Sequence, residues 1–407
     1  MSTEQKAAER LNSGRAWDDF CETIRQAGHS IERWDQVPDE LDRAEWYRFL
    51  SRLLRNGLER FLENCEPDRP RLRDAPWRQS INFQSPDQDH LLAEFVDGSH
   101  DYRIIGNRGT IPYFVMATWR AAQPADLGAR NWAQQGFEGL KEFDPAILRT
   151  THFLPSDAIS FDDQGNFEVI VSKTKQPGNW LGMTEDCVGM LVRTVYHRRE
   201  EETPPTMRIE RIDRPAPRPV RADEVAAGLA KAGQVLLGYA ELTRAWWQDN
   251  LGKRPNRLRF SMAQYLSNGG VPDRHHGFGT WEVPPGRALV ISFMPIDADY
   301  WIFQLCNLWQ ENLDNYEDGQ GHVTKYRCRF EADGSVRIVI AERDPGIGGN
   351  WIDPFGHVHG GMSLRFIKTA QKPPPLLVHE VALADLEREG TRLLTPETGV
   401  ISGEMTD

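Results

Sequence analysis

Two histidines and one carboxylate form the densest polar cluster in this sequence. Asp353, His357 and His359 lie in the segment G-N-W-I-D-P-F-G-H-V-H, which begins at Gly349. Side chains alternate in an extended chain, so the two histidines would point to the same side. Such a pair suits acid/base chemistry near neutral pH, with Asp353 orienting an imidazole, or it suits metal binding. Hydrogen bonding in a tight turn is the structural alternative, and the segment lacks the further ligands of a zinc motif.

A second group of candidates surrounds the aromatic segment Y-W-I-F-Q-L-C, which begins at Tyr300. An apolar pocket with a few polar contacts is one interpretation, and a sandwich core is the simpler one. Arg365 would hold an anionic or carbonyl oxygen. His276 lies in a Gly- and Pro-rich approach, V-P-D-R-H-H-G-F-G, where a surface turn is the structural alternative. The predicted substrate contacts are Arg365, Trp351, Asn350, Trp301, Gln304 and His276.

Composition and missing motifs exclude several classes of protein. The 407-residue chain has a formal net charge of -12, which argues against a nonspecific nucleic-acid surface. It contains no phosphate loop, no Rossmann glycine fingerprint, no G-x-S-x-G elbow and no H-E-x-x-H motif. No apolar run reaches the roughly 18 to 20 residues of a membrane helix, and the polar N-terminus carries no export signal. We therefore expect no cofactor, no nucleic-acid partner, no membrane span and a cytoplasmic location.

The polar cluster belongs to a pattern that occurs twice in the chain. G-N-W-I at Gly349 and G-N-W-L at Gly178 each lead through a turn into a hydrophobic strand with one arginine, Arg365 or Arg193. A hairpin pattern precedes each copy, D-Q-G-N-F-E-V-I-V in the first half and D-G-S-V-R-I-V-I in the second. The sequence therefore predicts an internal duplication. Only the second copy has the Asp and His, so it is the better candidate for an active site.

Helical and extended patterns divide the chain into five segments. Apolar residues at three- and four-residue steps between positions 15 and 66 predict two amphipathic helices, with Asp42 capping the second. Short runs rich in branched and aromatic residues predict antiparallel strands in both halves. The expected fold class is α+β, mainly β, with two related β-sandwich or jelly-roll-like units. We expect a helical N-terminal segment at 1–75, a first β-sandwich unit at 76–214, a linker and bridging helix at 215–272, a second β-sandwich unit at 273–382, and a C-terminal tail at 383–407 that is loose beyond Thr395.

Four stretches of the chain resemble the domain of unknown function 1214 family. They are the two Gly-Asn-Trp blocks with their arginine-bearing strands, the segment Y-W-I-F-Q-L-C-N-L-W, and the helical opening L-D-R-A-E-W-Y-R-F-L-S-R-L-L-R. The resemblance covers about Trp17 to Val381 and is strongest from Asn350 to Arg365. It implies β-sandwich or jelly-roll domains with added helices in bacterial proteins, and no catalytic residues come with it.

Together these patterns predict a cofactor-independent enzyme of small-molecule catabolism. Its substrate would be an apolar terpenoid, steroid or aromatic compound. The chemistry would be acid/base isomerisation, elimination, hydration or hydrolysis, carried by His357, His359 and Asp353. A noncatalytic ligand-binding or assembly module is one alternative, and a metal-dependent enzyme that uses the two histidines is another. We expect a homodimer.

Overall fold

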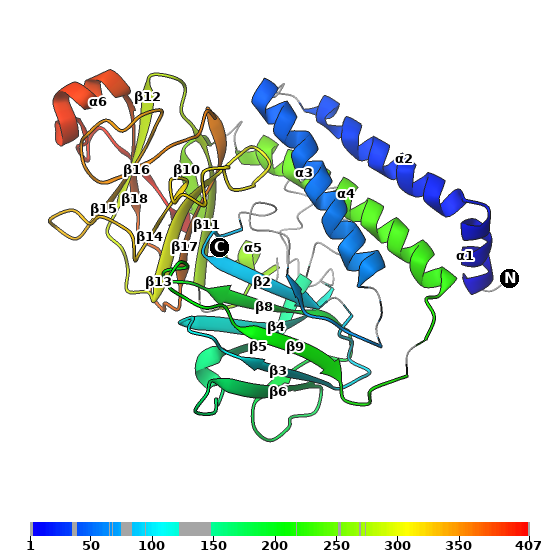
Figure 1. The fold of residues 1–407 in the computed structure, drawn as a ribbon. Coiled ribbons are helices and arrows are strands. Elements are labelled where there is room, and N and C mark those ends of the chain that lie inside the picture. The colour runs from blue at the N-terminus through cyan, green and yellow to red at the C-terminus, as the bar shows by residue number, and fades with distance from the viewer. Residues whose placement is uncertain are drawn as a thin grey trace. The chain divides into compact units, whose positions relative to one another are not determined.

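The computed structural model describes residues 3–34, 39–64, 66, 68–74, 84–93, 95–121, 148–216, 218–250, 254–267, 270–272 and 274–405. In this part of the chain, four β-sheets and a few helices give the predicted α+β, mainly β class (Figure 1). Two compact units are present. The first comprises Met1–Pro76, Asp87–Ala245 and Ser267–Gly270, and the second comprises Trp77–Pro86, Trp246–Leu266 and Val271–Asp407.

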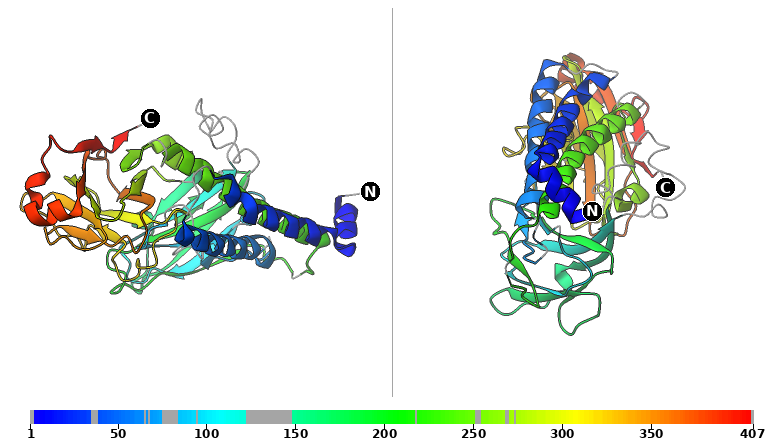
Figure 2. Two further views of the ribbon diagram at one scale, coloured as in Figure 1. Left: turned by 90° about the horizontal axis from the view of Figure 1, so that it is seen from above. Right: turned by 90° about the vertical axis from the view of Figure 1, so that its right-hand side faces the viewer.

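Four of the described α-helices belong wholly or mostly to the first unit. They are α1 (Thr3–Asn12), α2 (Arg15–His29), α3 (Glu40–Leu58) and most of α4 (Ala222–Asn250), within which the boundary between the units falls. A Cβ added at Gly57 of α3 would lie 3.2 Å from Ala232 Cα of α4, so these backbones approach closely (Figure 2). The predicted cap of α3 is wrong by one turn. Asp39 is the N-cap and accepts from the backbone N–H of Asp42 at 2.8 Å, because Asp42 occupies the third position of a capping box.

Two sheets of the first unit enclose its hydrophobic core. One has the strand order β1-β2-β8-β4-β5 and the other β7-β6-β3-β9. The strands are β1 (Arg73–Asp74), β2 (Gln88–Ala93), β3 (Tyr102–Asn107), β4 (Tyr113–Ala121), β5 (Leu148–Pro155), β6 (Asn166–Ser172), β7 (Trp180–Gly182), β8 (Cys187–Val195) and β9 (Thr206–Arg211). Phe114, Met116 and Val192 of the first sheet pack against Ile104, Val169 and Val171 of the second, as the alternation of strand side chains requires.

The second unit has the same sandwich arrangement. Its sheets have the orders β14-β13-β17-β11-β10-β20 and β16-β15-β12-β18-β19. The strands are β10 (Arg257–Phe260), β11 (Arg274–Glu282), β12 (Arg287–Phe293), β13 (Tyr300–Cys306), β14 (His322–Thr324), β15 (Val336–Ala341), β16 (Asn350–Ile352), β17 (His359–Ile367), β18 (Leu376–Ala382), β19 (Val400–Ser402) and β20 (Glu404–Met405). The short α5 (Met262–Ser267) follows β10, and α6 (Leu383–Glu389) covers the outer side of the second sheet through Leu383 and Leu386 (Figure 1).

Strand for strand, the two units share one sheet topology. The order β1-β2-β8-β4-β5 corresponds to β10-β11-β17-β13-β14, and β7-β6-β3-β9 corresponds to β16-β15-β12-β18. In each unit the short strand that starts at the Asn-Trp motif pairs in parallel with its neighbour, β7 with β6 and β16 with β15. None of the helices in the described part of the chain has the length and apolar character that crossing a bilayer requires.

The prediction of a loose tail is wrong, because the chain beyond Thr395 adds strands to both sheets of the second unit. β19 pairs antiparallel with β18, and β20 pairs parallel with β10. Ser402 Oγ accepts from the backbone N–H of Leu258 at 2.8 Å. Backbone pairing of this kind depends on register rather than side-chain pattern, so the polar tail gave no signal for it.

Candidate functional site

Asp353, His357 and His359 lie in and after a tight turn between β16 and β17. Asp353 Oδ1 accepts from the backbone N–H of Phe355 at 2.8 Å. His357 is buried, and both its backbone N and its ring Nδ1 lie 3.0 Å from the carbonyl oxygen of Pro354. His359 begins β17 opposite Glu282. For Asp353 and His357 these contacts correspond to turn hydrogen bonding, the structural alternative of the sequence, and their catalytic role stays a prediction.

Asn350 ties the edge of its sheet to a neighbouring loop. Its Nδ2 donates to the carbonyl oxygens of Arg329 and Arg337, both at 2.9 Å, and its Oδ1 accepts from the backbone N–H of Arg329 at 2.8 Å. The same three hydrogen bonds link Asn179 of the first unit to the backbones of Ser160 and Glu168. The repeated asparagine therefore has a fold-forming role in both units.

The two tryptophans among the predicted substrate contacts also serve the sandwich. The indole N–H of Trp351 donates to the carbonyl oxygen of Ala341 at 2.9 Å, as Trp180 donates to Ser172 Oγ at 3.0 Å in the first unit. Trp301 is packed in the core against Phe293. Because side chains alternate along β13, Trp301 lies on the opposite face from Gln304. The structure thus separates these two predicted contacts.

The remaining predicted contacts, Arg365, His276 and Gln304, meet on the face of the sheet that is turned away from the sandwich core. Alternate residues of four adjacent strands form this face, in cross-strand register. We term it the polar face. It comprises Thr324 and His322 on β14, Ile302, Gln304 and Cys306 on β13, Arg365, Ser363 and Gly361 on β17, and His276, Phe278 and Thr280 on β11.

Arg365 and His276 are direct cross-strand neighbours and form a hydrogen-bonded pair. Arg365 Nε donates to His276 Nε2 at 2.8 Å, and Arg365 Nη1 lies 3.5 Å from Gln304 Oε1. Arginine has no acceptor atom, so His276 Nε2 must accept and its ring proton sits on Nδ1. The imidazole also packs against the ring of Phe278, with ring centroids 3.7 Å apart and the ring planes tilted by 37°. These contacts fix the orientation of a buried guanidinium.

A chain of amide hydrogen bonds supports Gln304. Its Nε2 donates to Asn312 Oδ1 at 2.9 Å and to the carbonyl oxygen of Gln84 at 3.1 Å, while Asn312 Nδ2 donates to the same carbonyl at 2.8 Å. Both amide nitrogens therefore face oxygens, which leaves Gln304 Oε1 directed at Arg365. Hydrogen bonds in such a chain polarise one another in a low-dielectric interior.

The loop after β13 carries a fully buried carboxylate that the sequence patterns did not single out. Asn307 Oδ1 accepts from the backbone N–H groups of Trp309 and Glu311, at 2.9 and 3.0 Å. This folds the loop over Cys306 and buries Glu311, whose Oε2 lies 3.5 Å from Asn307 Nδ2. The only sequence signal is the density of acids and amides in N-L-W-Q-E-N-L-D-N.

Cys306 is surrounded by these groups but is unsuited to nucleophilic chemistry. Burial raises the pKa of its thiol to about 12, while the hydrogen bond from Gln304 and the charge of Arg365 lower it and the charge of Glu311 raises it. The thiol is therefore protonated at neutral pH, and thiolates rather than thiols are nucleophiles. Arg365 and Glu311 therefore have opposite effects on the pKa of this one thiol.

Three hydroxyls of the polar face have no hydrogen-bond partner among the described residues. They belong to Thr280, Ser363 and Thr324, and each residue is 0% exposed. A buried polar group without a partner costs about 1–3 kcal/mol, so such groups are rare in folded proteins. Three such hydroxyls on one face of one sheet indicate that these positions serve a function other than folding stability.

Four polar positions of the polar face have apolar counterparts in the first unit. Arg193 Nε donates to His90 Nε2 at 3.0 Å, so the Arg–His pair is present in both units. Around it, however, Ala117, Leu191 and Trp119 stand where the second unit has Gln304, Ser363 and Cys306, and Pro155 stands in place of Thr324. The sandwich therefore folds without these polar groups, and a structural requirement does not explain them.

No three His, Cys, Asp or Glu side chains are grouped for metal binding in the part of the chain that the structure describes. The alternative of a metal-dependent enzyme that uses His357 and His359 stays a prediction.

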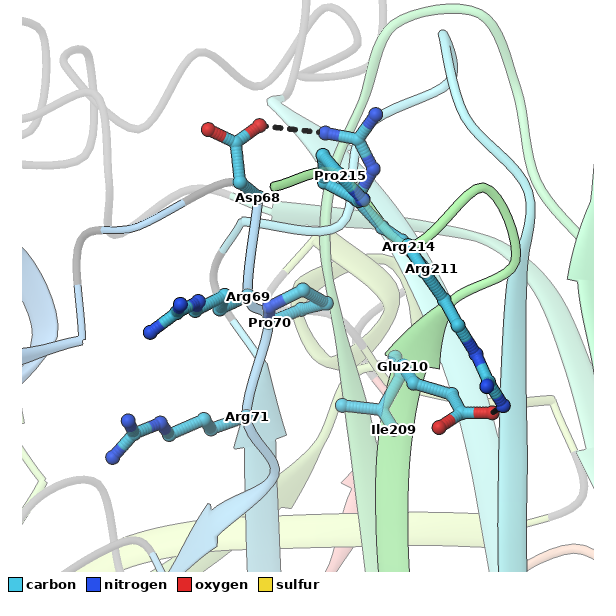
Figure 3. A pocket seen from close by; sticks show the side chains of 9 residues that line it. All are labelled: Asp68, Arg69, Pro70, Arg71, Ile209, Glu210, Arg211, Arg214 and Pro215. Carbon is cyan, nitrogen blue, oxygen red and sulfur yellow. Dashed lines mark hydrogen bonds and ion pairs between the residues drawn. The ribbon is translucent and has the colours of Figure 1, made fainter. Parts of the chain in front are cut away.

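A separate pocket of about 260 Å³ lies in the first unit (Figure 3). Its lining residues are Asp68, Arg69, Pro70, Arg71, Ile209, Glu210, Arg211, Arg214 and Pro215. Arg211 pairs with Asp68 at 2.8 Å and Arg214 pairs with Glu210 at 3.1 Å, whereas Arg69 and Arg71 extend away from Glu210 (Figure 3). Its charged groups pair with one another instead of converging on a point, so it is a weaker candidate than the polar face.

Comparisons with known proteins supply a fold relative but no activity. No protein-family profile matches the chain, and no curated protein sequence matches it. The crystal structure of an uncharacterized protein from Burkholderia cenocepacia is similar, with 33% identity and a TM-score of 0.83 over 93% of this chain and 100% of that chain. The crystal structure of a protein from Vibrio parahaemolyticus is 10% identical, with a TM-score of 0.44 over 88% of this chain and 98% of that chain.

Proposed function

Because this chain belongs to the same protein family as the uncharacterized Burkholderia cenocepacia protein, we propose a function from the polar face and not from any relative's activity. We propose that the polar face binds a polar small molecule and that the protein is a cofactor-independent enzyme acting on it by acid/base chemistry. One observation carries this proposal. Ser363 and Thr324, whose buried hydroxyls have no partner among the residues that the structure describes, occupy positions where the first unit has Leu191 and Pro155.

Two charged groups supply the chemistry in this proposal. The carboxylate of Glu311 takes a proton from a carbon next to a carbonyl group of the substrate. The C–H electron pair forms a carbon–carbon double bond, and the π electron pair of the carbonyl group moves onto its oxygen. The guanidinium of Arg365, oriented by His276 and Gln304, stabilises the negative charge that develops there. Return of the proton from Glu311 to another atom completes an isomerisation, and loss of a neighbouring leaving group completes an elimination.

The substrate of this proposal differs from the apolar compound expected from the aromatic residues. Trp301 lies in the core, whereas hydroxyl, amide and guanidinium groups cover the polar face. Burying these groups against a hydrocarbon would leave their hydrogen bonds unmade, which favours a substrate rich in oxygen. Acid/base roles for His357, His359 and Asp353 stay predictions, and Asp353→Asn compared with Glu311→Gln distinguishes the two locations.

Turnover by two matched variants tests the proposal. The full chain is incubated with a library of oxygenated metabolites, and conversion is followed by NMR. Glu311→Gln keeps the shape of the side chain but removes the base, so turnover falls by roughly 100-fold or more while binding persists. Asp353→Asn, which acts in the turn, leaves turnover unchanged. Equal turnover by wild type and Glu311→Gln would refute the role of Glu311, and binding without any conversion would identify a noncatalytic module.

We also propose that the two units arose by duplication of one ancestral unit. The shared strand order, the repeated Arg–His pair and the matching hydrogen bonds of Asn179 and Asn350 support this view. The relation to the domain of unknown function 1214 family, the homodimer and the cytoplasmic location stay predictions.

A further inference from the structure

We infer that the ligand of the polar face is a hydroxylated carboxylate, an open-chain or cyclic acid with hydroxyl groups along its carbon skeleton. This inference rests on the proposed function and specifies the substrate class for the same site.

The three hydroxyls select the kind of partner. Each serine or threonine hydroxyl carries one donor and two acceptor positions, so its best partner is a group that both donates and accepts. A ligand hydroxyl is such a group, whereas a carbonyl or an ammonium group is not. Because Thr280, Ser363 and Thr324 are fully buried, each hydrogen bond to the ligand replaces an unmet one rather than a bond to bulk water.

Strand geometry sets the spacing of the polar groups. Arg365 and Ser363 are two residues apart on β17, so their side chains leave the same face about 7 Å apart. Thr280 on β11 is the cross-strand neighbour of Gly361, which puts it diagonally beyond Ser363 by about 7–8 Å. Arg365, Ser363 and Thr280 therefore follow one path across the sheet, and a ligand with an anionic head and hydroxyls further along its chain matches that path.

Two positions of the polar face carry no hydrogen-bonding side chain and suit the ligand's carbon skeleton. Gly361 separates Cys306 from Thr280 in its cross-strand row and contributes no side chain. The ring of Phe278 lies between His276 and Thr280 along β11 and offers an apolar wall to C–H groups. A planar guanidinium with its orientation fixed by neighbours suits the two oxygens of a carboxylate.

Three compounds with the same number of carbon atoms test the inference by calorimetric titration of the full-length protein. They are gluconate, hexanoate and sorbitol, which carry carboxylate plus hydroxyls, carboxylate only, and hydroxyls only. The set is extended with shorter and longer hydroxy acids and their deoxy and alcohol counterparts. We expect the best hydroxy acid to bind at least about tenfold more tightly than its deoxy acid and than its alcohol.

Two variants assign the contacts within the site. Ser363→Ala reduces the advantage of the hydroxy acid over its deoxy acid, and Arg365→Lys reduces its advantage over the alcohol. Arg193→Lys, at the matching position of the first unit, changes neither ratio and serves as the control.

Equal binding of deoxy acids or of alcohols overturns the inference. The inference is also overturned if no hydroxy acid binds but other library compounds bind in a Ser363-dependent manner. In that case the proposed function still stands. If no compound of either set binds, the proposed function itself fails.

Discussion

Removing a buried hydroxyl from the polar face is expected to stabilise the free protein. Thr280→Val and Thr324→Val keep the shape of the side chain and replace a hydroxyl that has no partner among the described residues with a methyl group. Buried hydroxyls usually stabilise a fold through the hydrogen bonds that they make. A gain in stability is therefore the opposite of the ordinary result, and it is typical of a site whose stability is sacrificed for function.

The magnitude follows from the cost of an unmet hydrogen bond. Leaving a buried hydroxyl without a partner costs about 1–3 kcal/mol, and the valine variants remove that cost. For a unit of this size, each kcal/mol shifts the unfolding temperature by about 2–4 °C. We expect each variant to raise the unfolding temperature of the second unit by at least about 2 °C.

Thr118 of the first unit provides the matched control. It is also fully buried in a sheet, but its Oγ1 donates to the carbonyl oxygen of Gly182 at 2.7 Å. Thr118→Val leaves that oxygen unsatisfied and lowers stability by about 1–2 kcal/mol. Calorimetric and urea unfolding of the three variants measure these changes. If Thr280→Val and Thr324→Val lose as much stability as Thr118→Val, their hydroxyls are bonded in the folded protein and the reasoning is refuted.

Three further predictions concern the fold around the site. Asn350→Ala removes three hydrogen bonds from a buried position and should lower the free energy of unfolding in urea by about 3 kcal/mol. The loss should be larger than for Asn179→Ala, whose side chain is more exposed. An Asn350→Ala variant with unchanged stability would contradict this role. Burial raises the pKa of Cys306 to about 12, so iodoacetamide at pH 8 should modify the exposed Cys21 and leave Cys306 unmodified until the protein unfolds. Peptide mass analysis that finds Cys306 alkylated in the folded protein would disprove this prediction. A Cβ at Gly360 would overlap the carbonyl oxygen of Cys306, so Gly360→Ala should prevent the second unit from folding. If the Gly360→Ala variant unfolds at the wild-type temperature in circular dichroism, this steric prediction is wrong.

Local patterns in the sequence were sufficient for most of the elements. The predicted helices between positions 15 and 66 are α2 and α3. Their apolar spacing reports the face that each helix buries, which is a local property. The strand in the first hairpin pattern, D-Q-G-N-F-E-V-I-V, is β6, and the alternation of its side chains is likewise a local property. The repeated Asn-Trp motif also pointed to a real feature, although that feature is a set of hydrogen bonds within the fold.

The polar face required information that no local pattern holds. His276, Gln304 and Arg365 are far apart in the sequence, and only the cross-strand register of β11, β13 and β17 brings them together. Register follows from the pairing of whole strands, so it was not readable from any one of them. Glu311 was missed because its burial depends on a loop held by the side chain of Asn307. Density of chemistry-bearing residues instead drew attention to His357, which lies in a turn.

The most direct test of the central claim is a thermal-shift screen of polar metabolites against wild type and Ser363→Ala. We expect at least one compound to raise the unfolding temperature of wild type and to have a clearly smaller effect on Ser363→Ala, because Ser363 contacts the ligand in the proposed site. A matched Thr118→Ala variant should keep the full shift. If no compound stabilises wild type, or if every active compound stabilises Ser363→Ala equally, the polar face is not a ligand site.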